Sequence, residues 1–184
     1  DLAVATRTIQ SLQYGSLEIN SDVFERLEAN LSRFPEKPKT LPPMVWEWIQ
    51  LEASQGLVAS AMVTQLGTRS PKRLIPVLST VNVYTRRTIA QRLAEVEPWD
   101  AEIRETLLGL VGDASQWVRE EVVRLLQRCK ITDPESIQLE NCLTRKASDL
   151  RRGILGLLLN QSDDAAISAG QRLLQAKQAP QRQA

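Results

Sequence analysis

The stretch WVREEVVRLL, residues 117–126, has two counterparts elsewhere in the chain at intervals of 33 residues. They read YTRRTIAQRL at residues 84–93 and LRRGILGLLL at residues 150–159. In all three, a large apolar residue is followed by an arginine two positions later and by aliphatic residues five and nine positions later. A fixed period of this length is typical of stacked helical units, none of which can bury its apolar face alone.

The same interval extends to the segment that precedes each stretch. Val77, Leu110 and Leu143 form one apolar column, and a short break separates each of them from the stretch that follows. The breaks are residues 81–82, 113–115 and 146–148. They contain Asn or Ser, whose side chains can accept hydrogen bonds from the unpaired amides of a first helical turn. Each repeat is therefore predicted to be a helix, a tight turn and a second helix.

The middle repeat resembles a HEAT repeat. Arg119 in the second helix follows Asp113 in the turn by six residues, which is similar to the HEAT pattern in which an inter-helix aspartate meets a second-helix arginine of a neighbouring unit. The aspartate position holds Thr80 in the first repeat and Lys146 in the third. The resemblance covers about residues 70–177. It implies an all-α fold, a right-handed α-α superhelix in which antiparallel helical hairpins form a HEAT-like solenoid.

A second resemblance comes from the last part of the chain. Residues 150–159 and 169–182 are similar to the helical repeat regions of large bacterial multidomain proteins, among them those described as molybdate metabolism regulators. HEAT arrays mostly act as binding scaffolds, so the two resemblances imply a binding scaffold rather than an enzyme.

We expect one α-solenoid domain over residues 1–184. Four prolines in residues 35–43 exclude a helix there, and Pro71 is expected to open an α-helix through Leu74 and Leu78. The expected segments are N-terminal helices and a proline-rich loop at 1–42, a helical hairpin at 43–69, HEAT-like repeats at 70–99, 100–132 and 133–162, and a truncated repeat at 163–184. The repeat at 163–184 is predicted to be truncated, and the first residue is Asp1 and not Met. Both features predict a fragment of a longer chain.

Composition excludes several classes of protein. Hydrophobic residues make up 42% and charged residues 24% of the chain, as in an ordinary globular domain. The longest apolar run, residues 153–159, is far too short to cross a membrane, and no signal peptide is visible. A cytoplasmic protein is therefore expected. Cys129 and Cys142 are predicted to be buried, reduced thiols.

The inventory of side chains argues against an enzyme. The chain contains no His, which excludes a Ser-His triad, an imidazole base and a His metal site. The sequence contains no glycine-rich loop of the kind that binds phosphate groups. Glu120 and Glu121 are interpreted as charges on a solvated helix face. We therefore expect no catalytic residue, no metal and no cofactor.

The arginine column has two interpretations. Arginines in such a column can form a structural ladder that bonds turn carbonyls and acidic groups between neighbouring units, which is favoured because repeats recur for packing. They can also form an anion-binding stripe. The candidate partner- or anion-binding residues are Arg86, Arg87, Arg119, Arg145, Lys146, Arg151 and Arg152. The net charge of only +1 argues against a dedicated nucleic-acid binder, but leaves open a phosphate or acidic-protein site near residues 145–152.

The tryptophans suggest a different function. Trp117 and Asp113 are residue types that helical-repeat DNA glycosylases use to trap a damaged base. Trp117 shares its column with Tyr84 and Leu150, however, and is therefore predicted to lie in the core. Two further tryptophans, Trp46 and Trp48, lie about 200° apart on a predicted helix, so they are the candidates for an exposed aromatic contact.

These patterns lead to a definite expectation. The side chains expected to be buried between repeats are Ile89, Leu93, Val122, Leu126, Leu155 and Leu159. The function expected is a non-enzymatic scaffold that presents its second helices to a macromolecular partner, with protein favoured. The alternative is a nucleic-acid-binding, glycosylase-like domain. The uncovered apolar stripe of the last helix predicts self-association through residues 163–184.

Overall fold

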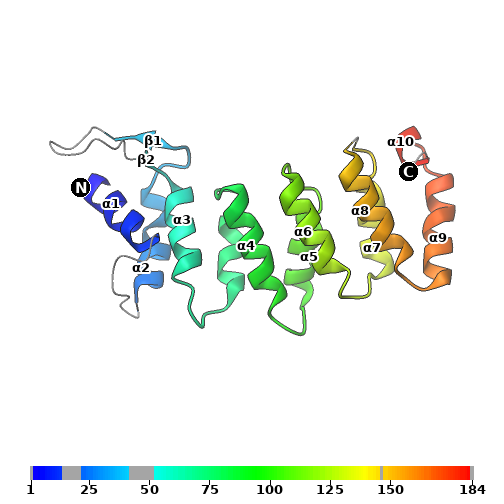
Figure 1. The fold of residues 1–184 in the computed structure, drawn as a ribbon, viewed down its shortest axis with the longest axis horizontal. Coiled ribbons are helices and arrows are strands. Elements are labelled where there is room, and N and C mark those ends of the chain that lie inside the picture. The colour runs from blue at the N-terminus through cyan, green and yellow to red at the C-terminus, as the bar shows by residue number, and fades with distance from the viewer. Residues whose placement is uncertain (1, 14–21, 42–51, 146, 183–184) are drawn as a thin grey trace. The chain divides into compact units, whose positions relative to one another are not determined.

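The computed structural model describes residues 2–13, 22–41, 52–145 and 147–182. This part of the chain is predominantly helical, and neighbouring helices pack on one another (Figure 1), which confirms the predicted all-α character. The longer helices are α1 (Leu2–Gln13), α2 (Val23–Asn30), α3 (Gln55–Thr64), α4 (Val83–Ala94), α5 (Ala101–Leu110), α6 (Gln116–Leu126), α7 (Asp133–Cys142), α8 (Ser148–Leu159) and α9 (Asp163–Leu174). The short elements are η1 (Leu31–Arg33), β1 (Lys39–Thr40), β2 (Glu52–Ala53), η2 (Pro71–Val77) and α10 (Ala179–Arg182).

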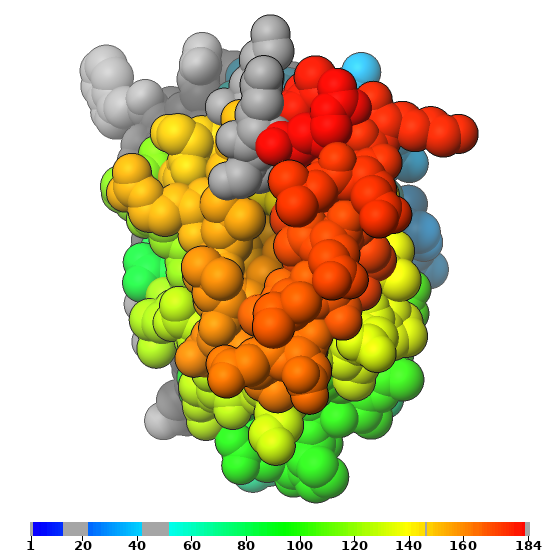
Figure 2. All heavy atoms as spheres, turned by 90° about the vertical axis from the view of Figure 1, so that its right-hand side faces the viewer, coloured from blue at the N-terminus to red at the C-terminus, as the bar shows by residue number. Residues whose placement is uncertain are grey.

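The chain forms two compact units, residues 1–89 (unit 1) and residues 90–184 (unit 2). Unit 2 contains the hairpin of α5 and α6, the hairpin of α7 and α8, and then α9 and α10. Each helix contacts its own hairpin partner and also its equivalent in the next hairpin, so that α5 packs on α7, α6 on α8 and α7 on α9. Figure 2 shows the face of unit 2 on which α9 lies outermost.

Side-chain caps fix where the helices of unit 2 begin. Asp100 accepts a hydrogen bond from the backbone N–H of Ile103 (3.1 Å), and Ser162 accepts one from Ala165 (3.4 Å). At the start of α7, the carboxylate of Glu135 accepts from the backbone N–H of Thr132 (2.7 Å). These bonds satisfy amides that a helix leaves without an intrahelical partner.

The predicted core is correct for the first two repeats. Ile89, Leu93, Val122 and Leu126 are all buried, and the 33-residue interval relates the first pair to the second. Burial of these aliphatic side chains is the main favourable contribution to the packing of such helices.

The prediction is wrong for the third repeat. Leu159 is 73% exposed and Leu155 is only half-buried, whereas Ile154 and Leu158, one position earlier, are buried. The interval from the second repeat to the third is therefore 32 residues, because α6 has 11 residues where α4 has 12. The leucine-rich end of α8 carries aliphatic side chains in either register, so the sequence pattern alone does not reveal the change.

In unit 1, α1 and α2 both pack on α3, and β1 pairs with β2 in an antiparallel ladder with Lys39 opposite Ala53. The segment that begins at Pro71 is the 3₁₀-helix η2 in place of the predicted α-helix. Pro76 inside it has no backbone N–H to donate and disfavours the α conformation of the residue before it. Gly67 lies three residues after the end of α3 and has a φ of 59°, a left-handed conformation that glycine adopts without steric cost.

Two other observations concern the described part of the chain as a whole. No helix in it is long and apolar enough to cross a membrane. Cys129 and Cys142 are free thiols, as predicted, but they are half-buried and not fully buried. Burial raises the pKa of both thiols.

Candidate functional site

A groove of about 530 Å³ lies between α6 and α8, two of the helices that the sequence predicts to form the binding face. Residues of both helices line it: Gln116, Arg119, Glu120, Val123, Arg124, Gln127, Ser148, Asp149, Leu150, Arg152, Gly153 and Gly156. The groove lies entirely within unit 2. It contains two of the predicted site residues, Arg119 and Arg152.

Two glycines of α8 shape this groove. A Cβ atom added to Gly153 would lie 2.9 Å from a methyl group of Val123, so the two helices approach closely there because Gly153 has no side chain. A Cβ atom added to Gly156, one turn later, would meet nothing within 4 Å. The helices are therefore in tight contact at Gly153, and the groove is open at Gly156.

This geometry predicts opposite effects for one substitution at two positions. Gly156→Ala is expected to raise the free energy of unfolding by about 0.5–1 kcal/mol, because Ala is the better helix former and its methyl group meets no atom. Gly153→Ala is expected to lower it by about 1–3 kcal/mol, because Val123 is β-branched and stiff in a helix. Urea unfolding of both variants checks the pair. Equal stabilisation by the two substitutions would contradict the close approach of α6 to α8.

Trp117 lies on the surface, and the prediction that it belongs to the core is wrong. Its side chain is 70% exposed, and Tyr84 in the first repeat is exposed as well. Both residues are the second of their helix, and the buried column begins one position later with Thr85 and Val118. Trp117 is therefore available for contact with a partner, whereas Leu150 belongs to the buried column.

The arginines donate to carbonyl oxygens in the turn that precedes their own helix, and these bonds together form a ladder. Arg86 donates to the carbonyl oxygen of Val81 (2.7 Å), and Arg151 donates to that of Arg145 (3.1 Å). Arg182 repeats the arrangement with the carbonyl oxygens of Ala176 and Lys177. The third member of the ladder is therefore Arg151, one position before the residue that the 33-residue interval indicates.

Arg119 is the most engaged member of the ladder. It donates to the carbonyl oxygens of Asp113 (2.8 Å) and Ala114 (2.9 Å), which confirms the predicted bond to the turn. It also forms an ion pair with Asp149 of α8 (2.6 Å), and both side chains are largely buried. Its guanidinium thus joins a turn to the next hairpin and contributes one wall of the groove.

The other predicted site residues are spread over several environments. Arg145 is exposed and donates to the carbonyl oxygen of Gly112, and Arg87 is half-buried. Arg152 is exposed in the groove, and its side chain has no partner among the described residues. The remaining candidates, Lys146, Trp46 and Trp48, lie outside the described residues, as does the first helix expected in the hairpin at 43–69.

Several polar residues of unit 2 were missed by the sequence analysis. Glu121 is buried, contrary to its interpretation as solvated charge, and accepts from Gln91 (3.0 Å) and Arg124. The carboxylate of Glu140 is also buried and pairs with Arg172 (2.6 Å). The contacts of Gln91 with Glu121 and of Arg172 with Glu140 join residues 30 and 32 positions apart, a spacing that follows the repeat and could have indicated them.

Arg104 and Glu135 form a further pair of this kind, at 2.7 Å, between α5 and α7. Burial alone would raise the pKa of the Glu135 carboxyl group. Hydrogen bonds from Arg104 and Thr132 outweigh that effect, so the pKa lies below its ordinary value. The acidic group therefore stays ionised and serves to join two hairpins.

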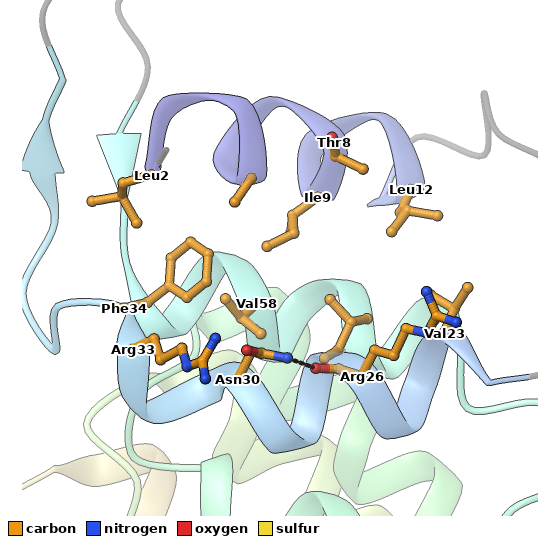
Figure 3. Close-up of a pocket in the computed structure, with 12 residues that line it drawn as sticks. Leu2, Thr8, Ile9, Leu12, Val23, Arg26, Asn30, Arg33, Phe34 and Val58 are labelled. Atoms are coloured by element: carbon orange, nitrogen blue, oxygen red, sulfur yellow. Dashed lines mark hydrogen bonds between the residues drawn. The ribbon is translucent and has the colours of Figure 1, made fainter.

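A second hollow, of about 610 Å³, lies in unit 1 (Figure 3). Leu2, Ile9 and Leu12 of α1 point toward Phe34 and Val58 on the opposite side. Asn30, Arg26 and Arg33 add polar groups to this lining. An apolar lining with a few polar groups is typical of pockets that take small ligands.

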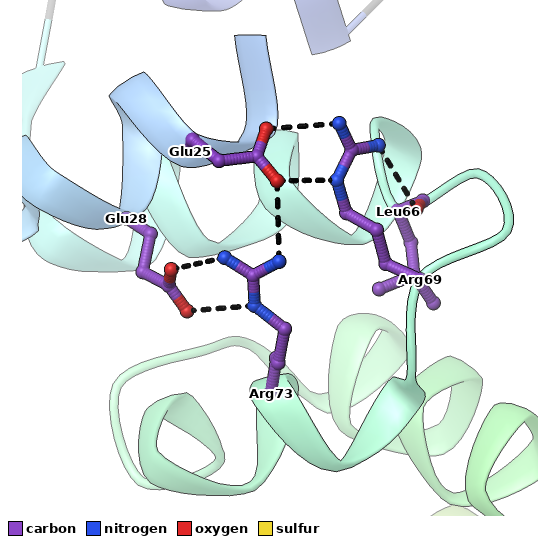
Figure 4. Close-up of polar contacts among 5 residues, drawn as sticks. All are labelled: Glu25, Glu28, Leu66, Arg69 and Arg73. Atoms are coloured by element: carbon purple, nitrogen blue, oxygen red, sulfur yellow. Dashed lines mark hydrogen bonds and ion pairs between the residues drawn. The ribbon is translucent and has the colours of Figure 1, made fainter. Parts of the chain in front are cut away.

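A charged cluster joins α2 to the segment after α3 (Figure 4). Arg69 pairs with Glu25 (2.7 Å), and Arg73 pairs with Glu25 (3.2 Å) and with Glu28. The guanidinium of Arg73 also lies 4.5 Å from the ring centroid of Phe24. Hydrogen bonding from Arg69, followed by bonding to the backbone, lowers the pKa of Glu25 to about 2. Each cation in this cluster has an acidic partner, so the cluster is interpreted as structural.

The family model described as "Family of unknown function (DUF5724)" matches residues 6–184. The chain belongs to this family. No curated protein and no solved structure matches the chain. The family description names no activity and no partner, so the surface of the molecule has to indicate both.

The groove of unit 2 offers contacts of several kinds. Its lining combines three basic side chains with two acidic ones, and Gln116 donates to Glu120 (2.8 Å) across one helical turn. Val123 adds apolar surface, a Cβ atom at Gly156 would meet no neighbour, and the exposed ring of Trp117 lies on α6, the helix of Val123. Trp and Arg are enriched in protein-binding surfaces relative to the rest of a protein's surface.

Proposed function

We propose that this protein is a non-enzymatic helical-repeat scaffold that binds a protein partner through the groove between α6 and α8. The observation that carries the proposal is the groove of mixed charge between α6 and α8, one of whose helices also bears the exposed indole of Trp117. Large aromatic side chains contribute a disproportionate share of the energy of protein interfaces, and an exposed one has no packing role to explain it.

The repeated contacts of unit 2 support a HEAT-like architecture. We propose that its hairpins stack as a right-handed α-α solenoid, as the resemblance implies, with α6 and α8 on one face. The contacts of α5 with α7 and of α6 with α8 agree with such stacking. Within unit 2, Arg119 and Arg151 each donate to a carbonyl oxygen in the turn of their own hairpin, and Arg119 also pairs with Asp149 of the next hairpin.

Side-chain chemistry supports the non-enzymatic part of the proposal. The chain contains no His, and the acidic residues of unit 2 that are buried, Glu121 and Glu140, each pair with an arginine. A general acid or base needs a proton that it can exchange with a substrate, and a carboxylate held by a guanidinium at neutral pH is poorly suited to this. We place the scaffold in the cytoplasm.

The alternative is a nucleic-acid-binding, glycosylase-like domain. It is favoured by one observation, the exposure of Trp117, because a base-stacking residue must be accessible. Asp113 has a structural role instead, since its carboxylate accepts from the backbone N–H of Ser115 (2.7 Å) and its carbonyl accepts from Arg119. In the groove, Arg119 and Arg124 already have acidic partners, which leaves little charge for phosphates.

Affinity capture with matched variants tests the two functions. The native chain and three variants, Trp117→Ser, Gly156→Arg and the control Ile137→Ser, are immobilised and exposed to lysate of cells that encode the protein. Ile137 is an exposed aliphatic residue of α7, outside the groove. We expect one or more proteins to bind the native chain and the control, and to be depleted at least about tenfold by both groove variants.

A purified candidate from this capture is then titrated directly against the same four chains. Equal retention by all four chains would contradict the proposed surface. Binding of labelled single-stranded DNA that falls steeply with salt and is lost in Trp117→Ser would favour the alternative.

A further inference from the structure

The outer face of α9 is apolar and uncovered. Ile167 is 59% exposed and Leu174 is 73% exposed, although both are large aliphatic residues. In Figure 2, α9 runs in orange and red along the front of this face, and its outward surface faces the viewer. The helix packs on α7 and α8 through its other side, where Ala169 is buried.

These residues form a stripe with the spacing of a helix–helix contact. Asp163, Ile167, Gly170 and Leu174 recur at intervals of four, three and four residues, and therefore lie on one side of the helix. A Cβ atom added to Gly170 would meet nothing within 4 Å, so another backbone has room to approach at the middle of the stripe.

The charges at the two ends of α9 are opposite. Asp163 and Asp164 stand in its first turn, and Lys177 follows its last turn. All three residues are exposed, and none of their side chains has a partner within the described residues. A helix with an acidic beginning and a basic end is complementary to a second copy of itself that runs in the opposite direction.

We propose that this stripe is a self-association surface, on which α9 of a second copy of the chain packs antiparallel across a two-fold axis near Gly170. In this arrangement Ile167 lies opposite Leu174 of the second copy. Asp163 and Asp164 lie near Lys177 of the second copy, and the symmetry forms this contact twice. The surface is independent of the groove between α6 and α8.

The size of the stripe sets the strength of association. A helix of 12 residues is about 18 Å long, so a pair buries roughly 600 Å² in total, well below the ~1,600 Å² of a standard stable interface. The dimer is therefore weak. It forms at high concentration and exchanges readily with monomer.

Sedimentation equilibrium of the 184-residue chain between about 10 µM and 1 mM tests the proposal. The native chain is expected to dimerise over this range. Ile167→Glu is expected to raise the dissociation constant at least tenfold, while Ile137→Glu, which places the same charge on an exposed residue of α7, leaves it unchanged. Circular dichroism of each variant confirms that it is folded.

A charge exchange identifies the arrangement. Lys177→Glu alone, or Asp163→Lys with Asp164→Lys, is expected to weaken self-association at least fivefold, because like charges then meet at both ends of the pair. An equimolar mixture of these two chains is expected to dimerise as well as the native chain, since the heterodimer restores both sets of opposite charges. A native chain that stays monomeric at 1 mM overturns the proposal, as does a mixture that fails to recover or an Ile137→Glu variant that dissociates.

Discussion

Replacing Leu126 by Ala is expected to lower the free energy of unfolding by about 2–5 kcal/mol, the largest effect of any substitution considered. The side chain is only 1% exposed and packs in the core of unit 2. Its truncation removes buried apolar contacts and leaves a cavity that the rigid helices around it fill only in part. Urea unfolding followed by circular dichroism at 222 nm measures the change.

Leu159→Ala is the matched control for this experiment. The 33-residue interval places Leu159 in the same column as Leu126, yet its side chain is 73% exposed. Its truncation is expected to change stability by less than about 0.5 kcal/mol. Equal losses at the two positions would restore the 33-residue register and contradict the structure of α8.

The comparison of these leucines shows what the sequence alone could determine. The helical repeat, the turns and the buried positions of the first two repeats follow from the spacing of apolar residues, since only one face of each helix can pack. The third repeat was misaligned because Arg151 and Arg152 are adjacent and residues 155–159 are mostly leucine. Either register satisfies the pattern, and only the packing of α8 on α6 distinguishes them.

Exposure at the helix ends was harder to predict than burial within helices. Trp117 looked like a core residue because large apolar side chains are usually buried, and because it shared a column with Leu150. The correct register makes Asp149, not Leu150, its equivalent in α8, and all of these second positions lie at the start of a helix. The one-residue error in the register of the third repeat therefore contributed to the wrong prediction for Trp117.

The ion pairs between hairpins could be predicted only in part. A bond from an arginine to its own turn depends only on how many residues separate the two, which is why the bond from Arg119 to the turn was predictable. The pairs Arg172–Glu140 and Arg104–Glu135 depend on how successive hairpins align, which becomes visible only after the register is correct. In unit 1, the sequence shows Pro71 and Pro76, but the spacing of apolar residues around them fits an α-helix and a 3₁₀-helix alike. The 3₁₀-helix η2 is therefore seen only in the structure.

Replacing Arg119 by Ala is expected to lower the free energy of unfolding by about 2–4 kcal/mol. The substitution leaves the carboxylate of Asp149 largely buried without its cation, and removes the donor to the carbonyl oxygens of Asp113 and Ala114. An unpaired charge in a poorly hydrated site costs more than the pair contributes when intact. Chemical unfolding at low and high salt measures the loss, and a pair this well shielded is expected to respond only weakly to salt.

Arg152→Ala separates this structural role from ligand binding. Arg152 lies in the same groove and in the column indicated by the 33-residue interval, but it is exposed and its side chain has no partner within the described residues. Its removal is expected to change stability by less than about 0.5 kcal/mol.

In a double-mutant cycle, Arg119→Ala and Asp149→Ala are expected to couple by about 1–3 kcal/mol, because each substitution removes the same ion pair. If Arg119→Ala instead left stability intact and abolished partner binding, the ladder would be a ligand-binding stripe, and its hydrogen bonds to the turns would not contribute to the fold.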